Sequence, residues 1–431
     1  MNQNQFEVIV IGAGAAGLMA ALEVALTGRS VAIVEARQRT GGRINTIRNV
    51  SIDLPIEMGA EFVHGKLQST RMLLEKAGAN VYKVEGDIWQ KNNQGLREQK
   101  DFIEDYKALE NKFGQLKEDI SVHEFIQNYL QGDKMEEARI TVKNYVEGYY
   151  AADTKRASTF ALRDELNGAD EQQFRIEGGY IDLVNYLEEQ CRNNKVGIFL
   201  STPAQEIVWQ KDQVKIICQE KELTANKIIV TVPVGVLQSG VLHFIPEIPG
   251  YLEAARHLGF GGVIKTILIF EEAFWKNKDF TQGKDLEKMG FLFSDALIPT
   301  WWTAYPKNAP ILTGWSGGPH VDQIKDLGDD EIVATAIASL SRIFSMKYEE
   351  LNNKLKSSYV ANWVKDAYCL GGYSYDVVNG AVAKSVLKKA IDDTIYFAGE
   401  GLFEGLEIGT VEAALVNGRD TAHRVVASFK N

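Results

Sequence analysis

Residues 6–17 read Phe-Glu-Val-Ile-Val-Ile-Gly-Ala-Gly-Ala-Ala-Gly, and the architecture of the chain is best predicted from them. Its first six residues are mostly apolar and β-branched, which is typical of a buried strand. A glycine-rich turn follows, then an Ala/Leu-rich helix to about Leu26 and a second buried strand over residues 30–35. The order strand, turn, helix, strand predicts a Rossmann-like α/β unit.

The turn has the spacing G-x-G-x-x-G, in which each glycine has its own physical reason. The first allows the tight turn, the second lets a pyrophosphate approach the backbone, and the third lets the helix pack on the strand. The helix N-terminus then offers free N–H groups to the phosphates. Glu35 ends the second strand 18 residues after Gly17, where a carboxylate accepts hydrogen bonds from ribose hydroxyls. The turn residues that we expect to bind a dinucleotide are Gly12, Gly14, Ala15, Ala16 and Gly17.

The bulk composition is that of a globular protein with room for two domains. The chain has 431 residues, of which 45% are hydrophobic and 24% charged. Its 47 Lys+Arg against 58 Asp+Glu give a net charge of -11, which disfavours nucleic acid and anionic membranes as partners. Three widely spaced cysteines form no CxxC and argue against a disulfide framework or a zinc site. The first apolar run is broken by glycines and stopped by Glu23, so we expect no membrane span and a cytoplasmic location.

Further along the chain, apolar spacing and β-rich runs outline a second region. An apolar stripe at spacings of four and three predicts one amphipathic helix, and Ser121 with Glu124 predicts a capping box that opens the next helix. The stripe consists of Phe102, Tyr106, Leu109, Phe113, Leu116 and Ile120. Later β-rich runs lie at 197–200, 214–218, 227–232, 263–270, 290–293, 310–315 and 395–398, and later helical patterns at 329–345, 350–357 and 409–428.

Residues 35–43 read Glu-Ala-Arg-Gln-Arg-Thr-Gly-Gly-Arg and resemble the E-A-R-x-R-x-G-G-R signature of the flavin amine oxidase family. The resemblance implies that the dinucleotide is FAD, that Glu35 holds its ribose, and that Arg43 lies near the pyrophosphate and the flavin. A guanidinium suits a phosphate, and two glycines let the backbone come close. The residues of this segment that we expect at the cofactor are Glu35, Ala36, Arg37, Gly42 and Arg43.

The resemblance extends to the other end of the chain. Residues 231–237 resemble the family's T-V-P-x-G-V-L segment, and residues 201–207 occupy the place of the segment that holds the adenine, with Ala204 where members usually have valine. Residues 397–412 resemble the C-terminal FAD segment. There the resemblance places Gly399 and Glu400 at the ribityl or pyrophosphate side. The backbone of Leu406 and Glu407, at a helix N-terminus, would face the flavin pyrimidine.

These patterns together predict an α/β fold of two interleaved parts. A Rossmann-like FAD-binding domain would alternate with an α+β substrate-binding domain that carries a helical insertion. We expect the FAD-binding domain to comprise residues 1–80, 195–255 and 390–431. The substrate-binding domain would comprise residues 81–194 and 256–389.

Three segments point to the active site. Lys265 lies in an otherwise apolar strand, where a lysine is costly unless it is paired or functional; by resemblance it holds a water against flavin N5, although the solvent face of an edge strand is an alternative. Trp363 and Tyr373 belong to a segment that resembles W-x-x-D…G-x-Y-S-Y, whose aromatic faces attract cations and exclude water. By the same resemblance Trp363 packs by the flavin and Tyr373 walls the substrate amine, while core packing is the alternative for both.

The third segment, residues 59–65, reads Gly-Ala-Glu-Phe-Val-His-Gly and resembles the G-A-x-x-x-[HE]-G segment of polyamine oxidases. His64 would face the nitrogen chain of the substrate, and Glu61 would hold a secondary ammonium. A flavin-adjacent carboxylate and a structural histidine are the alternatives. We also expect the backbone from Met58 to Glu61, including Gly59 and Ala60, at the cofactor.

Two positions depart from the monoamine oxidases. Their second cage tyrosine falls on Leu406, and the cysteine that links their flavin falls on Gly372. We therefore predict noncovalent FAD and a substrate other than a simple monoamine, with Cys369 as a buried thiol. The histidines show no ligand spacing, so we assign no metal. The pairs Trp301-Trp302 and Phe403-Glu404 either line a substrate tunnel or pack in the core.

The predicted reaction is the two-electron oxidation of an amine C–N bond, most simply of a polyamine. Hydride would pass to flavin N5, the imine would be hydrolysed, and O2 would reoxidise the flavin to give H2O2. An L-amino-acid oxidase is a weaker alternative because no arginine lies between Asp53 and Lys66 to bind a carboxylate. A monoamine oxidase, a flavin desaturase and a flavin-binding scaffold with little turnover stay open. The sequence does not indicate the oligomeric state.

Overall fold

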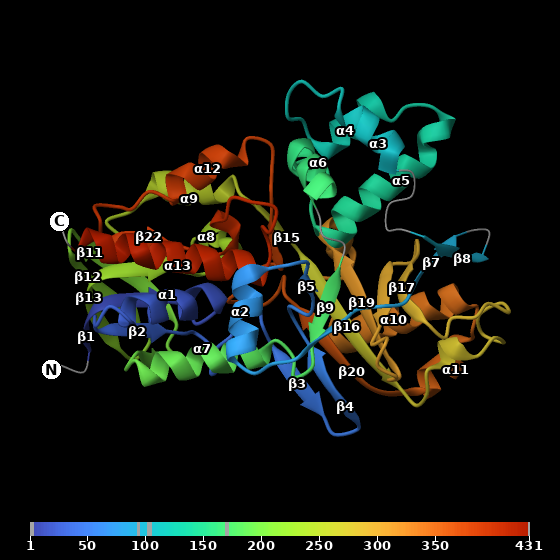
Figure 1. Cartoon of the computed structure of the whole chain (residues 1–431), viewed down its shortest axis with the longest axis horizontal. Coiled ribbons are helices and arrows are strands. Elements are labelled where there is room, and N and C mark those ends of the chain that lie inside the picture. The colour runs from blue at the N-terminus through green and yellow to red at the C-terminus, as the bar shows by residue number, and fades with distance from the viewer. Residues whose placement is uncertain (1–3, 93–94, 101–105, 169–171, 430–431) are drawn as a thin grey trace.

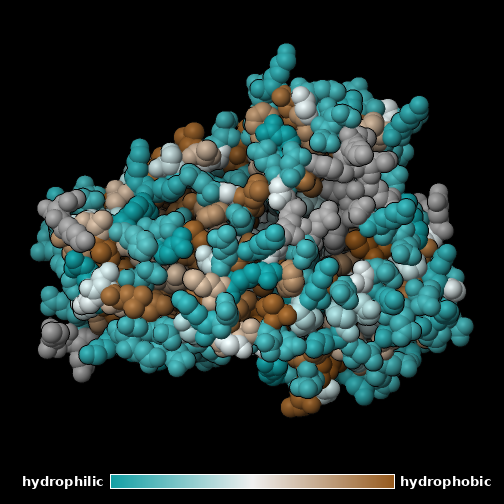
Figure 2. Space-filling model, viewed as in Figure 1, coloured by the Kyte–Doolittle hydropathy of each residue, from teal (hydrophilic) through white to brown (hydrophobic). Residues whose placement is uncertain are grey.

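The computed structural model describes residues 4–92, 95–100, 106–168 and 172–429. Figure 1 shows two parts side by side: a sheet flanked by helices at the end that holds both termini, and a second sheet at the opposite end. A group of short helices from residues 106–168 stands above the second part. Figure 2 shows that hydrophilic residues cover most of this face of the molecule, with apolar residues in scattered groups.

The first sheet brings together strands from widely separated parts of the sequence. Its parallel strands pair in the order β10, β2, β1, β13, and β22 joins the far side of β13. Strands β12, β11 and β14 extend the sheet beyond β13. The bounds are β1 (Gln5–Ile11), β2 (Val31–Val34), β10 (Gly197–Phe199), β11 (Ala204–Gln210), β12 (Gln213–Cys218), β13 (Glu222–Val230), β14 (His243–Ile245) and β22 (Ile395–Phe397).

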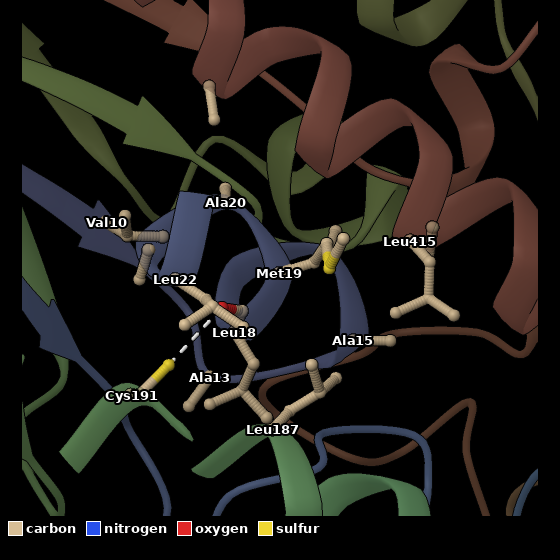
Figure 3. Close-up of a cluster of buried hydrophobic side chains, with 14 of the residues drawn as sticks. Val10, Ala13, Ala15, Leu18, Met19, Ala20, Leu22, Leu187, Cys191 and Leu415 are labelled. Carbon is tan, nitrogen blue, oxygen red and sulfur yellow. Dashed lines mark hydrogen bonds between the residues drawn. The ribbon is translucent and has the colours of Figure 1, made fainter. Parts of the chain in front are cut away.

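Helix α1 (Ala15–Ala25) is buried on nearly every side. It packs between α13 (Val411–Ser428) and α7 (Ile181–Asn193), so the first helix of the chain contacts the last. The Cys191 thiol donates to the Leu18 carbonyl oxygen at 3.4 Å, which fixes α7 against α1. Figure 3 shows this packing, with side chains that include Leu18, Leu22, Leu187, Cys191 and Leu415.

The second sheet is almost entirely antiparallel and carries a separate apolar core. Its strands follow the order β20-β16-β19-β18-β17-β7-β8, and only β17 and β7 run parallel. Helix α10 (Asp329–Phe344) packs on it through that core. The bounds are β7 (Asp87–Asn92), β8 (Gly95–Gln99), β16 (Val263–Phe270), β17 (Met289–Phe293), β18 (Thr300–Thr303), β19 (Ile311–Gly317) and β20 (Leu355–Asn362).

The helical insertion consists of α3 (Tyr106–Phe113), α4 (Val122–Tyr129), α5 (Glu136–Asn144), a π-helical turn (Tyr145–Tyr149) and α6 (Thr159–Gly168). The predicted capping box of α4 is confirmed: the Glu124 N–H donates to Ser121 Oγ at 3.2 Å, and the Ser121 N–H donates to Glu124 Oε2 at 3.0 Å. The prediction of one helix along the whole apolar stripe is wrong. Helix α3 ends before Gly114, and Leu116 and Ile120 reach the same core from a loop. Phe102 lies outside the described residues.

One further helical prediction is wrong in part. Residues 348–353 form α11 (Tyr348–Asn353), but residues 355–357 begin β20, where hydrogen bonds to β16 override the local helical pattern.

The other elements are β3 (Thr46–Asn49), β4 (Ile52–Glu57), β5 (Val63–His64), α2 (Gln68–Lys76), β6 (Val81–Lys83), β9 (Gln173–Ile176), α8 (Val234–Ser239), α9 (Pro249–Arg256), β15 (Gly259–Gly261), β21 (Tyr373–Tyr375) and α12 (Gly380–Leu387), with 3-10 turns at 133–135, 274–276, 318–323 and 400–402.

The predicted domain bounds remain a prediction, but one of them has a structural consequence. The first sheet draws on residues 5–34, 197–245 and 395–397, and the second sheet on residues 87–99 and 263–362. A boundary at residue 195 separates α7 from α1, although α7 packs against α1.

Candidate active site

A single cavity of about 1820 Å³ connects the glycine-rich turn with Lys265, Trp363 and Tyr373. Pockets for drug-sized ligands measure roughly 300–1,000 Å³, so this cavity has room for a dinucleotide together with a substrate. Its walls come from both sheets and from the helical insertion. They include every residue that the sequence places at the cofactor except Gly17 and Met58.

The glycine-rich turn has the geometry that a phosphate site needs. Gly12 has a φ of +106°, and a Cβ on Gly17 would lie 1.9 Å from the Gly12 carbonyl oxygen, so neither position tolerates a side chain. Gly14 is the N-cap of α1, and no side chain caps the N–H groups that follow it. These free N–H groups begin at Ala15 and Ala16, which line the cavity. The turn therefore fits the pyrophosphate of FAD.

Glu35 is fixed at the end of β2 by backbone donors. The Ala13 N–H donates to Glu35 Oε2 at 2.7 Å, and the Arg37 N–H donates to Oε1 at 2.8 Å. Each carboxylate oxygen can accept a second hydrogen bond, so Glu35 retains the capacity to bind ribose hydroxyls.

Two arginines of the 35–43 segment join it to the C-terminal half of the chain. Arg43 Nη1 donates to Glu400 Oε1 at 2.8 Å and to the Gly372 carbonyl at 2.7 Å. Arg37 Nη2 donates to Asp366 Oδ1 at 2.5 Å. The sequence predicts Arg37, Arg43 and Glu400 at the cofactor, but it does not show which residues these three pair with.

The strip from Met58 to Ala60 supports both the tryptophan and the lysine. Trp363 Nε1 donates to the Met58 carbonyl at 3.0 Å, and Lys265 Nζ donates to the Gly59 carbonyl at 3.2 Å. A Cβ on Gly59 would lie 1.8 Å from the Arg43 carbonyl oxygen. Only glycine therefore lets this strip lie against the 35–43 segment.

Lys265 lies on β16, between β20 and β19, and is 1% exposed. This placement excludes the alternative of a solvent-facing lysine on an edge strand. Its Nζ donates to Glu61 Oε2 at 2.7 Å as well as to Gly59. An ammonium has three N–H groups, so one is left for the cavity that Lys265 lines.

Glu61 is shared by two cations and an indole. Its Oε1 accepts from Arg175 Nε at 2.9 Å and from Trp302 Nε1 at 3.0 Å, while Oε2 accepts from Lys265. Burial on its own raises the pKa of Glu61, but Lys265 and Arg175 outweigh burial and hold that pKa below its usual range. The expectation that Glu61 binds the substrate ammonium is therefore disfavoured, because its charge is already neutralised within the protein.

Sequence reasoning did not single out Arg175. It lies between Phe174 and Ile176 on β9 and is buried. A charged residue in a short apolar strand is the signal that drew attention to Lys265, and it applies equally here. Arg175 also donates to the backbone carbonyls of Thr303 and Tyr305, at 3.0 and 3.3 Å.

His64 faces the cavity beside a tyrosine of the insertion. Its Nδ1 lies 3.3 Å from Tyr149 Oη, and the two rings meet edge to face. Burial lowers the pKa of His64 from 6.5 to about 4. The imidazole is therefore neutral at pH 7 and does not repel a cationic ligand.

Replacing His64 with asparagine should flatten the loss of stability on acidification. Between pH 6.5 and 4 the unfolded chain binds a proton at His64 that the folded protein does not. The contribution of the neutral His64 to the free energy of unfolding is therefore fully present above pH 6.5 and is lost as the pH falls towards 4. We expect this to cost about 1 kcal/mol per pH unit in the wild type only. Urea unfolding at several pH values, with excess FAD, measures it. The exposed His243→Asn variant serves as control, and an unchanged slope in His64→Asn would contradict the assignment.

Aromatic rings form the wall around Tyr373. The Trp315 ring stacks near it, with centroids 6.2 Å apart and planes at 21°, and Trp302 lies 5.8 Å from Trp315. The sequence did not identify Trp315, which provides an aromatic neighbour for Tyr373 even though position 406 is leucine. Trp301, by contrast, belongs to the core of the second sheet.

In each of the pairs Trp301-Trp302 and Phe403-Glu404, one residue lines the cavity and the other does not. Phe403 lines the cavity, whereas Glu404 pairs with Lys388 at 2.7 Å on the surface. Cys369 lines the cavity as a buried thiol, and burial raises its pKa to about 11.

Leu406 and Glu407 line the cavity, but not from the helix itself. They lie in a turn, and α13 begins at Val411 with Thr410 as its N-cap, whose Oγ1 accepts from the Ala413 N–H at 3.2 Å. The expectation that they lie at the helix N-terminus is therefore wrong by about one turn.

The described residues contain neither a cluster of metal ligands nor a helix suited to crossing a membrane. No group of three or more His, Cys, Asp or Glu side chains is arranged to hold a metal ion in that part of the chain. None of its helices combines the length and the apolar composition needed to cross a membrane.

The chain is similar in sequence to a family of flavin enzymes and to several of its curated members. A family model described as flavin containing amine oxidoreductase matches residues 15–131 and 91–426. Polyamine oxidase 3 of Oryza sativa subsp. japonica is 25% identical over 463 residues, which cover 98% of this chain and 90% of that protein. Lysine-specific histone demethylase 2 of Homo sapiens is 26% identical over 97% of this chain and 53% of that protein.

Solved structures match over the whole chain. Putrescine oxidase bound to putrescine superposes with a TM-score of 0.80 at 20% identity, covering 98% of this chain and 99% of that one. Cyclohexylamine oxidase from Brevibacterium oxydans IH-35A gives a TM-score of 0.79 at 18% identity, covering 99% and 100%. At these identities the likeness concerns the fold, and it confirms the predicted fold class.

Proposed function

This chain belongs to the family of flavin-containing amine oxidoreductases, and from that premise we propose that it oxidises a polyamine C–N bond with noncovalently bound FAD, using O2 as the final acceptor. The family and the enzyme class predicted from the sequence, an FAD-dependent amine oxidase, are confirmed. The polyamine, the noncovalent attachment, O2 and the product H2O2 are the proposal.

The observation that carries the proposal is the continuity of the cavity. It runs from the glycine-rich turn and Glu35 to Lys265 and an aromatic wall. These residues fit FAD, which when bound accepts a hydride equivalent from the carbon next to the amine. The residues that would hold it are Gly12, Gly14, Ala15, Ala16, Glu35, Arg43, Gly399, Glu400, Leu406 and Glu407.

The chain's own residues prepare the amine for oxidation. Tyr373 and Trp315 offer aromatic faces to a cation, and their apolar surroundings favour the neutral amine that the reaction needs. Lys265 is held by Glu61 and Gly59, so its remaining N–H has a fixed direction and can position a water molecule in the cavity. Orientation and the exclusion of bulk water are the main contributions of the protein.

The geometry disfavours some of the alternative functions more than others. An amino-acid oxidase needs a free arginine for the carboxylate, but Arg175 is engaged by Glu61 and two backbone carbonyls. A monoamine oxidase gains from the Trp315 neighbour of Tyr373, which offsets the leucine at position 406. A desaturase and a scaffold with little turnover are separated from an amine oxidase by the experiment below. The three free, buried cysteines favour the cytoplasm as the proposed location.

Anaerobic flavin bleaching tests the proposal. The purified holoenzyme is mixed with spermine, N-acetylspermine, spermidine, putrescine, benzylamine and a set of L-amino acids. We expect the polyamines to bleach the flavin fastest and to give H2O2 when air is readmitted. Bleaching only by benzylamine or only by an amino acid would overturn the polyamine substrate, and no bleaching at all would favour a scaffold. Acid precipitation should release the FAD into the supernatant; flavin that stays with the pellet would contradict noncovalent binding.

A further inference from the structure

The helical insertion gives the cavity a row of tyrosines that ends at a carboxyl group. Tyr373 Oη donates to the Tyr149 carbonyl oxygen. The Tyr149 ring stacks on Tyr145, with centroids 5.2 Å apart and planes at 21°, and the Tyr145 hydroxyl lies close enough to the Glu165 carboxyl of α6 to influence its pKa. All four side chains line the cavity. The two tyrosines of the insertion lie in its π-helical turn, a distortion that is frequent at functional sites.

Glu165 differs from three other glutamates that line the cavity, Glu61, Glu400 and Glu412. Glu61 is paired with two cations, Glu400 with Arg43, and Glu412 accepts two backbone N–H groups. Among the described residues, no cation contributes to the electrostatics of Glu165, which is half-buried. A carboxylate held away from water without a counter-charge is costly, so a cationic ligand would supply what this position lacks.

We propose that Glu165, with Tyr145 and Tyr149, forms a second cation subsite, which binds the distal ammonium of a diamine or polyamine while the reacting amine lies by Tyr373. The inference rests on the proposed function, because it assumes that an amine is oxidised beside Tyr373. It adds the residue that would distinguish a substrate with two cationic ends from one with a single amine.

The surroundings of Glu165 suit this role. The tyrosine faces attract an ammonium, and the neutral His64 lets a dication pass. An apolar stem would meet Leu166 and Leu406, which both line the cavity.

Binding at this subsite should release a proton. Burial, aided by Asp376 and opposed by the Tyr145 hydrogen bond, raises the pKa of Glu165 to about 8. Asp376 is itself paired with Lys384 at 2.6 Å, and the remaining groups that sense Glu165 are Tyr149 and Tyr373. At pH 7 the carboxyl carries a proton. When an ammonium binds, the O–H bond breaks, the proton passes to solvent, and the carboxylate pairs with the ligand.

The test compares Glu165→Gln with Asp164→Asn. Asp164 is exposed, pairs with Arg163 and does not line the cavity, so its variant makes the same change from carboxyl to amide one position away. Flavin reduction is followed anaerobically with putrescine, spermidine and n-butylamine. In Glu165→Gln we expect Kd for the diamine and the polyamine to rise about 10- to 100-fold and Kd for butylamine to stay within about twofold. Asp164→Asn should match the wild type.

Calorimetry provides a readout without turnover. Putrescine and butylamine are titrated into holoenzyme with pre-reduced flavin, in two buffers of different ionisation enthalpy. In the wild type at pH 7, putrescine should release nearly one proton more than butylamine, and in Glu165→Gln this difference should vanish. Glu165→Asp keeps the charge on a shorter side chain and should shift the preference towards longer diamines.

The outcomes separate the subsite from the proposed function. If the wild type oxidises none of the three amines, the proposed function fails. The number of protons released on putrescine binding still decides whether Glu165 binds a dication. If Glu165→Gln weakens both amines equally, Glu165 has a structural role and the subsite is overturned. If Glu407→Gln, and not Glu165→Gln, removes the diamine preference, the assignment to Glu165 is wrong.

Discussion

Replacing Glu61 with glutamine should lower the free energy of unfolding by about 3–5 kcal/mol. The carboxylate neutralises Lys265 and Arg175, whose side chains are 1% and 8% exposed. Glutamine keeps the shape but leaves both cations buried without a counter-charge, which is the costly case for a buried ion pair. Urea unfolding of the wild type and the variant, both with excess FAD, measures the difference.

Glu177→Gln is the matched control for this prediction. Glu177 pairs with Lys307 at 3.4 Å, and both side chains are more than 40% exposed. Loss of such a surface pair should change stability by roughly 0–1 kcal/mol. A Glu61→Gln variant that loses no more than this control would show that the three buried charges are not coupled. In the double variant Glu61→Gln/Lys265→Met, part of the lost stability should return, because one unpaired cation is gone.

Replacing Lys265 with methionine should slow reoxidation of the reduced flavin by O2 about 10²- to 10³-fold, the usual cost of removing one preorganised donor at a reacting centre. Methionine fills a similar volume but has no N–H to direct into the cavity. Glu61 keeps Arg175 and Trp302 as partners, so the variant should lose less stability than Glu61→Gln. Stopped-flow mixing of photoreduced enzyme with oxygenated buffer gives the rate.

Lys227→Met is the control for the reoxidation rate. Lys227 is also buried on a strand and pairs with Asp212 at 3.0 Å, but it does not line the cavity. Its variant should reoxidise at the rate of the wild type even if it unfolds more easily. Equal rates for Lys265→Met and the wild type would remove the proposed role of Lys265.

Features that depend on neighbouring residues were predictable from the sequence. The glycine-rich turn, its helix and the capping box of Ser121 are each specified within a few residues, and all three occur in the structure. The long apolar stripe misled the prediction because periodicity shows which residues reach a core but not whether one helix carries them. Gly114 marks the place where α3 stops and a loop continues to the same core.

Pairings between distant segments were not predictable in the same way. The sequence identifies Glu61 and Lys265 separately, but their ion pair and the contribution of Arg175 depend on three strands or loops meeting in space. Glu61 was therefore expected to be open to substrate. Trp315 is a similar case: an aromatic residue on an apolar strand gives no sign that it will stack by Tyr373. Arg175 is the exception, because a charged residue in a short apolar strand can be recognised from the sequence.

The contact between the first and last helices also bears on how the protein is made. On the ribosome, β1 and α1 emerge first, yet β1 needs β13 as a neighbour and α1 needs α13, where Gly418 lets the two helices approach closely. At about 5–20 residues per second, the nascent N-terminal segment waits on the order of 20–80 s for the last helix to be synthesised. During that interval α1 lacks α13 as a partner and exposes apolar surface. We therefore expect the growing chain to be prone to aggregation and to bind chaperones.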